Sequence, residues 1–169
     1  MTGYAEDSME LRGYYPGVIG RIVYLHAIYY HKHWDFDVSF ETQVGRELSD
    51  FMAAFQPERD GFWAADMGGK FTGAVAIDGH SSDKDGARLR WFIVDERFQG
   101  QGIGKHLLDA ALAFCRDAGH RRVYLWTFRG LDRARALYEQ AGFLLSEEHA
   151  VRQWGSHITE QMFLLEQPF

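Results

Sequence analysis

A glycine-rich loop at residues 99–104, Gln-Gly-Gln-Gly-Ile-Gly, is the stretch of this sequence best suited to bind a charged ligand. Before it, β-branched and aromatic residues dominate a run in which Leu89, Trp91 and Ile93 alternate with Arg90, Phe92 and Val94, and this predicts a strand. After it, apolar residues recur at helical spacing from Ile103 to Cys115. Glycine lets a ligand approach the backbone, and a helix N-terminus presents free N–H groups and a positive dipole end. Together, these elements predict an anion site, usually for phosphate.

The residues of this loop exclude two common phosphate sites. A Walker-type loop needs Gly-Lys followed by Ser or Thr, but His106 follows Gly104 and Lys105. A dinucleotide-binding loop needs another glycine three residues after Gly104, and leucine stands there. The pattern that remains is Gln-x-x-Gly-x-Gly, formed by Gln99, Gly102 and Gly104. A short glycine loop is also compatible with an ordinary turn, so its flanking elements matter.

Gln-x-x-Gly-x-Gly resembles the acetyl-CoA motif of the GCN5-related N-acetyltransferases, and a second segment strengthens the resemblance. Residues 132–143 contain Ala-x-x-Leu-Tyr-x-x-x-Gly-Phe, which resembles the tyrosine helix of that family. The resemblance covers the chain from about Met9 to its end. It implies that the loop holds the pyrophosphate of coenzyme A and that the preceding strand holds pantetheine. The cofactor-binding residues it implies are Phe92, Ile93, Val94, Gln99, Gly100, Gln101, Gly102, Ile103, Gly104, Lys105, Arg133, Ala134 and Tyr138.

Shorter segments resemble the acetyltransferase halves of fused proteins that carry a winged-helix regulator of the MarR type. These segments are His33-Trp34-Asp35, Phe40-Glu41, Leu89-Arg90, Leu125-Trp126-Thr127 and Gly155-Ser156-His157. The sequence does not include the regulator half, so the resemblance does not imply DNA binding. The net charge of −6 also argues against nucleic acid as the main partner.

Transfer of an acetyl group from a thioester to an amine sets three chemical requirements. The attacking amine must be neutral, the tetrahedral oxyanion must be stabilised by donors, and the leaving thiolate must be protonated. The resemblance places the thioester between the strands that end at Val94 and Phe128, where backbone N–H groups polarise its carbonyl. It also implies that Tyr138 is the general acid for the thiolate. A tyrosine on a helix is otherwise most often a packing residue.

Two positions depart from the pattern of well-studied family members. Many members carry a glutamate base on the strand before or after the coenzyme helix. Here the first strand offers Arg88 and Arg90, and the second offers Trp126. Many members also carry an asparagine contact to the cofactor at the start of the tyrosine helix, where this chain has Leu131. The general base must therefore come from another element.

We place the acceptor amine near Glu41, which is the catalytic carboxylate that the sequence offers outside those strands. The helices between the first two strands commonly border the acceptor pocket in this family, and Trp34, Phe36 and Phe40 supply an aromatic wall beside Glu41. A carboxylate there attracts an ammonium group and accepts its proton directly or through water. The alternative is that Glu41 is an exposed helix residue without a role. His33 or ordered water is then the next candidate for the base.

The remaining candidate residues favour packing or surface roles. Cys115 is the only cysteine, so no internal disulfide forms, and its apolar helix face predicts burial. His31 and His33 do not share a helix face, and His26 supplies no complete ligand set, so we expect no metal. Arginines in the second half either lie on a solvated surface or surround an anionic cofactor. They are Arg116, Arg121, Arg122, Arg129, Arg133 and Arg135.

Composition and element order predict one domain over residues 1–169, with 1–8 a loose leader, and the resemblance implies that it is an N-acetyltransferase domain. The hydrophobic content of 46% and charged content of 25% are typical of a globular chain. No apolar run reaches membrane-spanning length and no signal peptide is present, so we expect a cytoplasmic protein with no membrane partner. The oligomeric state stays open, a homodimer included.

The elements predict a mixed α/β fold. We expect strands at 9–14, 62–67, 71–78, 89–94, 123–128, from 143 and at 158–165, and helices at 18–33, 38–55, 103–118 and 132–141. The resemblance implies a mostly antiparallel, twisted sheet of about seven strands with four helices, its parallel central strands splayed at the cofactor site. We therefore expect an acetyl-CoA-dependent N-acetyltransferase acting directly on a small-molecule or peptide amine. The alternative is a non-catalytic coenzyme A sensor or docking module.

Overall fold

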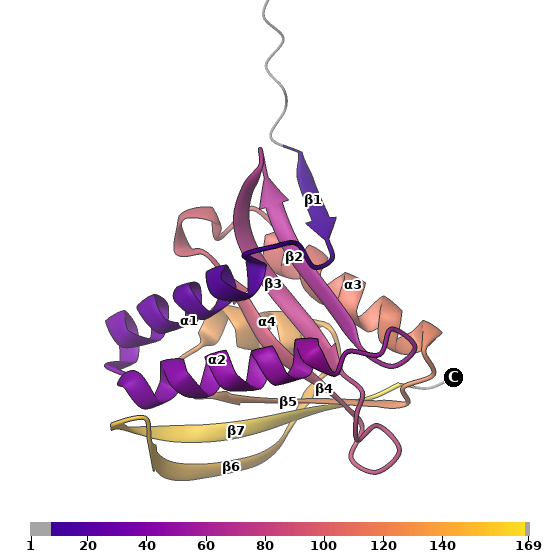
Figure 1. Cartoon of the computed structure of the whole chain (residues 1–169). Helices are drawn as coiled ribbons and strands as arrows, with labels where there is room; N and C mark the ends of the chain where they lie inside the picture. Colours follow the sequence, from indigo (N-terminus) through magenta and orange to yellow (C-terminus); the bar gives the residue numbers. More distant parts are fainter. Residues whose placement is uncertain (1–7, 168–169) are drawn as a thin grey trace, which may run out of the picture.

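The computed structural model describes residues 8–167, which form a seven-stranded sheet with four α-helices (Figure 1). The strands are β1 (Met9–Arg12), β2 (Gly61–Met67), β3 (Lys70–Asp78), β4 (Ala87–Val94), β5 (Arg122–Phe128), β6 (Leu144–Gln153) and β7 (Ser156–Glu166). The helices are α1 (Val18–Trp34), α2 (Val38–Ala53), α3 (Ile103–Asp117) and α4 (Asp132–Gln140), with a short 3₁₀ helix η1 (Glu96–Phe98). The predicted fold class is confirmed. The predicted leader lies outside the described residues, apart from Ser8.

The central strands β4 and β5 are parallel and separate along their length. The sheet order is β1-β2-β3-β4-β5-β7-β6, and the other neighbouring pairs are antiparallel. β4 and β5 pair only at Ala87 with Val123 and at Arg88 with Tyr124. The connection between them runs through α3, as a parallel pair requires. From Leu89 onward, the edge of β4 that faces β5 therefore has no strand partner.

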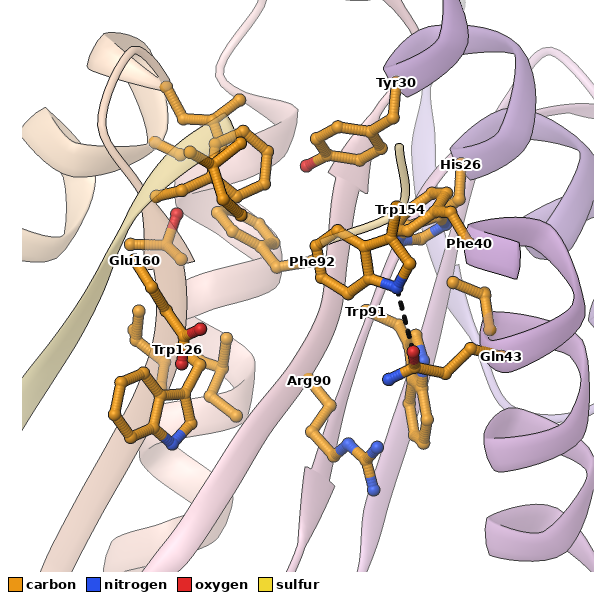
Figure 2. A pocket seen from close by; sticks show the side chains of 18 of the residues that line it. His26, Tyr30, Phe40, Gln43, Arg90, Trp91, Phe92, Trp126, Trp154 and Glu160 are labelled. Atoms are coloured by element: carbon orange, nitrogen blue, oxygen red, sulfur yellow. Dashed lines mark hydrogen bonds between the residues drawn. The ribbon is translucent and has the colours of Figure 1, made fainter. Parts of the chain in front are cut away.

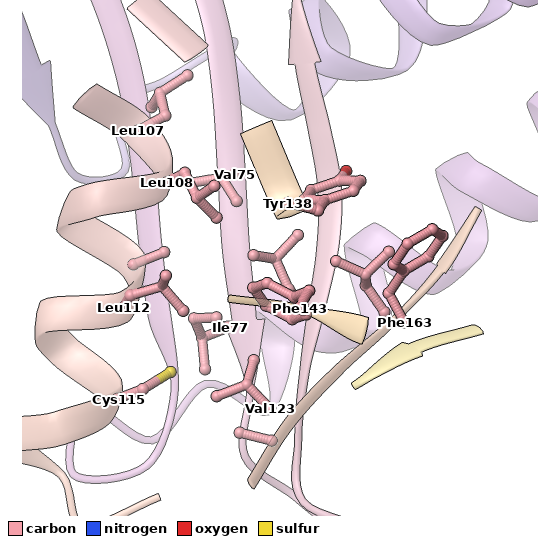
Figure 3. Packing of buried hydrophobic residues seen from close by; sticks show 14 of the residues in the cluster. Val75, Ile77, Leu107, Leu108, Leu112, Cys115, Val123, Tyr138, Phe143 and Phe163 are labelled. Atoms are coloured by element: carbon pink, nitrogen blue, oxygen red, sulfur yellow. The ribbon is translucent and has the colours of Figure 1, made fainter. Parts of the chain in front are cut away.

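The helices cover both faces of the sheet. In Figure 1, α1 and α2 lie in front of the sheet, and α3 and α4 lie behind it. The larger core cluster joins α3 and α4 to the strands and includes Leu108, Val123 and Phe163 (Figure 3). A second cluster joins α1 and α2 to β2 and β3 and includes Ile22 and Leu48. No helix within residues 8–167 is long and apolar enough to cross a membrane.

Strand β4 contains a bulge at Trp91. Ala74 of β3 faces Ile93, whereas Ala76 faces Arg90, so β4 gains one residue over β3. Trp91 has a φ of 48°, in the left-handed region that side chains other than glycine rarely adopt. Before the bulge, Leu89 packs in the larger cluster; after it, the even-numbered Phe92 packs there. The simple alternation expected over Leu89–Val94 is therefore wrong beyond Arg90.

Candidate active site

The glycine-rich loop connects η1 to the N-terminus of α3. Gly100 and Gly102 have φ values of 80° and 81°, a conformation that favours glycine. The first bond of α3 is donated by the His106 backbone N–H to the Gly102 carbonyl at 3.1 Å. The backbone N–H groups of residues 103–105 precede this bond and have no carbonyl partner within the helix. The structure thus places the predicted loop residues at a helix N-terminus, a position that favours anions.

Side chains tie this loop to β4 and to α4. Gln99 donates from Nε2 to the Val94 carbonyl at 3.2 Å, and Arg133 donates from Nη1 to Gln99 Oε1 at 3.1 Å. A Cβ added to Gly104 would lie 3.0 Å from Leu137 Cδ1. Gly104 therefore lets α3 and α4 approach closely, a packing role in addition to the predicted ligand contact.

Most of the six arginines that the sequence offered either as surface residues or as neighbours of an anionic cofactor do not contact the loop. Within the described contacts, Arg133 is the member that touches the loop. Three other members form exposed ion pairs: Arg122 with Glu166, Arg129 with Glu148 and Arg135 with Glu139. These three arginines are solvated surface residues.

Cys115 is fully buried on α3, and burial raises the pKa of its thiol to about 12, as expected for a packing residue.

A cavity of about 330 Å³ lies where β4 and β5 separate (Figure 2). Residues of α1, α2, β4, β5, α4 and the β6–β7 hairpin line it. Trp154 of the hairpin donates from Nε1 to Gln43 Oε1 of α2 at 2.9 Å, which joins two walls of the cavity. The lining includes Phe92, Ala134 and Tyr138, three of the predicted cofactor-binding residues.

Tyr138 belongs to both the core and the cavity. Its side chain is 5% exposed, and its ring packs against Phe92, Phe143 and Phe163 at centroid distances of 5.8, 5.8 and 6.2 Å (Figure 3). Burial raises the pKa of Tyr138 far above its usual value, and the Tyr30 hydroxyl adds to this effect. Tyr138 therefore keeps its proton at neutral pH, and its hydroxyl is present as a hydrogen-bond donor at the cavity wall.

Two carboxylates that the sequence did not single out line the cavity. Glu160 of β7 is paired in register with Phe128 of β5, and within residues 8–167 no side chain bonds to its carboxylate. Glu47 of α2 accepts from Arg90 Nη2 at 2.5 Å. The signal for Glu160 was its place on a strand that pairs with β5, since paired residues share one face of a sheet. That pairing is not visible in the local sequence.

The structure does not bring Glu41 to this cavity. Glu41 is exposed on α2, whereas Phe40 and Glu47 of the same helix line the cavity. Successive helix residues are rotated by about 100°, so Glu41 points away from the face that Phe40 presents. Trp34 and Phe36 pack in a cluster with Phe40 rather than lining the cavity. The predicted aromatic wall is thus mainly a packing cluster.

The three histidines of α1 have separate partners. His26 is buried, lines the cavity and donates from Nδ1 to the Ile22 carbonyl at 2.8 Å, which leaves Nε2 as an acceptor. Burial lowers the pKa of His26 to about 4, so it is neutral at pH 7. His31 bonds a backbone carbonyl, and His33 contacts Glu96. In the described part of the chain, no group of three His, Cys, Asp or Glu side chains is arranged to hold a metal.

The chain belongs to the acetyltransferase (GNAT) family, whose model matches residues 25–143. It is 31% identical over 103 residues to an uncharacterised N-acetyltransferase of Methanocaldococcus jannaschii, covering 57% of this chain and 44% of the relative. It is also 31% identical over 116 residues to human N-acetylaspartate synthetase, covering 68% of this chain and 38% of the relative. The chain thus spans less than half the length of these two relatives. The structure of YncA from Salmonella typhimurium with its cofactor acetyl-CoA superposes on this chain with a TM-score of 0.72 at 17% identity. The superposition covers 95% of this chain and 94% of YncA.

Proposed function

We propose that this chain is an acetyl-CoA-dependent N-acetyltransferase that moves the acetyl group directly to a primary amine of a small molecule or peptide. The observation that carries this proposal is the cavity between β4 and β5. Phe92, Ala134 and Tyr138 line it together with the carboxylates of Glu47 and Glu160. One cavity thus contacts both the predicted cofactor residues and groups able to meet an amine.

Coenzyme A would occupy the loop and the free edge of β4. The N–H groups of residues 103–105 would hold the pyrophosphate, because a helix N-terminus favours anions. The Lys105 ammonium, which pairs with Asp109 at 2.6 Å, would add positive charge at the same helix end. Pantetheine would follow Phe92–Val94, since this part of β4 has no strand partner on the side of β5. Backbone N–H groups there would polarise the thioester carbonyl and stabilise its oxyanion.

The reaction needs a proton acceptor on one side and a proton donor on the other. Neutralising a lysine-like amine near pH 7 costs about 4–5 kcal/mol, so a nearby base lowers the barrier. We assign that role to Glu160, directly or through water, in place of the exposed Glu41. The neutral amine attacks the carbonyl carbon, the C–S bond breaks, and Tyr138 donates its proton to the departing thiolate. The proton that the nitrogen loses on becoming an amide returns to Tyr138 through water, which restores the enzyme.

Two further proposals concern the whole chain. We propose that residues 1–169 form one N-acetyltransferase domain, and that it is functionally similar to the acetyltransferase halves of MarR-type fusions. Support for the likeness is that two of the matching segments meet. The Ser156 hydroxyl, from one segment, donates to the Trp34 carbonyl of another at 2.7 Å. An amine acceptor also agrees with the names of relatives, N-acetylaspartate synthetase among them.

The proposal is tested by incubating the purified chain with acetyl-CoA and a panel of amines while a thiol reagent measures released coenzyme A. A reaction without acceptor gives the hydrolysis background, and the buried Cys115 limits reaction of the protein itself with the reagent. Release above background, with an acetylated amine identified by mass spectrometry, is the expected result. Tight binding of acetyl-CoA without turnover of any amine would instead support a coenzyme A sensor.

A further inference from the structure

Arg88 is a cavity-lining cation with an unmet hydrogen bond. It stands on β4 at the last position where β4 still pairs with β5, opposite Tyr124. Among the buried side-chain nitrogen and oxygen atoms of residues 8–167, Arg88 Nε is the one that lacks a hydrogen-bond partner. A buried N–H without an acceptor costs free energy, and an anion that reaches it recovers that cost.

The neighbouring acidic groups do not neutralise Arg88 because they are held by Arg90. Arg90 donates to Glu47 at 2.5 Å and to Asp78 at 3.2 Å, so both carboxylates already have a guanidinium partner. In the described residues, no side chain forms an ion pair with Arg88. The cavity therefore contains one guanidinium, that of Arg88, without an ion-pair partner among residues 8–167.

The charged groups of the cavity lie in two separate regions. Arg88 is level with Tyr124 of β5, whereas Glu160 is level with Phe128 of the same strand. These backbone levels are four residues apart along β5, or about 13 Å at the rise of a strand, before the lengths of the two side chains are counted. An acceptor with an amine at one end and an anion at the other would complement this separation.

We propose that the acceptor is an amine that also carries a carboxylate, and that Arg88 binds this carboxylate. This inference rests on the proposed N-acetyltransferase function and adds the chemical class of its substrate. A guanidinium binds a carboxylate through paired N–H donors, which a neutral amide does not match. Arg88 thus selects acidic acceptors, whereas the region near Glu160 receives the reacting amine.

The test uses acceptor pairs that differ only in the carboxylate. Amino acids, ω-amino acids and dipeptides are each compared with their C-terminal amides, which separates the effect of charge from that of length. We expect the free acids to have a kcat/KM about 10- to 100-fold higher, the range for a charge-assisted hydrogen bond. Arg88→Gln should bring the acid-to-amide ratio close to one, mainly through KM, and Arg88→Lys should restore part of it.

Controls separate an anchoring role from a structural one. Arg21→Gln removes an exposed guanidinium on α1 and should leave the ratio unchanged. Thermal unfolding and coenzyme A binding show whether Arg88→Gln is folded; if it is not, Arg88→Met is used, since it keeps an apolar stem. Equal use of acids and amides by the wild type, or an unchanged ratio in a folded Arg88 variant, overturns the inference.

Failure of the proposed function gives a different result. If the wild type turns over no amine, acetyl transfer fails, and calorimetry with coenzyme A present still tests Arg88. Binding of the free acids that Arg88→Gln weakens supports the carboxylate site, whereas absence of such binding overturns it.

Discussion

Arg133 donates from Nη1 to Gln99 Oε1 at 3.1 Å, and this bond joins the first turn of α4 to the residue that opens the glycine-rich loop. Gln99 in turn donates to the Val94 carbonyl at the end of β4. A single side chain thus fixes the loop relative to the splayed strand and to the helix that carries Tyr138. The cofactor loop and the proposed general acid are therefore held together without any ligand.

The glycine loop is tested by comparing Gly102→Val with Gly119→Val. These glycines flank the two ends of α3 with φ values of 81° and 77°, so a side chain causes similar backbone strain at each. Only the Gly102 side chain would enter the proposed pyrophosphate site. We expect both variants to lose stability and only Gly102→Val to lose coenzyme A affinity, at least about tenfold, measured by calorimetry.

Gly104 is unsuitable for this test because its Cβ would lie 3.0 Å from Leu137 Cδ1, which confounds ligand and packing effects. Equal coenzyme A affinities for the wild type and folded Gly102→Val would show that the loop does not hold the pyrophosphate.

Tyr138→Phe keeps the buried ring and removes the proton donor. Its packing against Phe143 and Phe163 is retained, so the melting temperature should change little. If the hydroxyl is the general acid, kcat falls about 10²-fold or more while the Kd for coenzyme A is unchanged. Tyr24→Phe, on an exposed residue of α1, is the control. Full activity in Tyr138→Phe would mean that water protonates the thiolate.

The fold was predictable because its signals are local. Apolar spacing located the helices, and strand patterns with glycine turns located the sheet within a few residues. The bulge at Trp91 carries no such signal, because tryptophan is not a residue that favours a positive φ. Its position depends on how β4 pairs with β3 and on how the sheet packs, which sequence spacing does not report.

The site was predictable only where it is contiguous in sequence. The loop and Tyr138 belong to short motifs, so their residue types were enough to propose them as site residues. Glu160 and Arg88 meet the cavity through pairing of distant strands, and Glu41 is turned away by the phase of its helix. Charged residues that act from strands depend on register, and one sequence does not fix register between distant strands.

The variants Glu160→Gln and Glu41→Gln distinguish between the carboxylate that the structure favours as proton acceptor and the one that the sequence favoured. We expect Glu160→Gln to lower kcat/KM about 10²-fold at pH 7 and to approach the wild type as pH rises, because more amine is then neutral. Glu41→Gln should follow the wild-type profile, since its side chain is exposed outside the cavity. The opposite pattern would place the amine beside Glu41, and three identical profiles would exclude both carboxylates.

His26 should make the folded state sensitive to acid. Its folded pKa is lowered to about 4 by burial, whereas the unfolded chain has the ordinary value near 6.5. Between these values the unfolded chain binds a proton that the folded chain does not, so stability present above pH 6.5 is lost as pH falls toward 4. The loss reaches about 3 kcal/mol at its full extent.

His26→Asn removes this titration and keeps an amide donor near the Ile22 carbonyl. Urea unfolding of both proteins from pH 7.5 to pH 4 measures the difference in their free energies of unfolding, and acid effects of other groups are common to both. We expect His26→Asn to be the less stable protein at pH 7.5, because it leaves a smaller side chain in a buried site. That difference should shrink or reverse by pH 4. Parallel curves across this range would show that His26 does not hold its neutral form on folding.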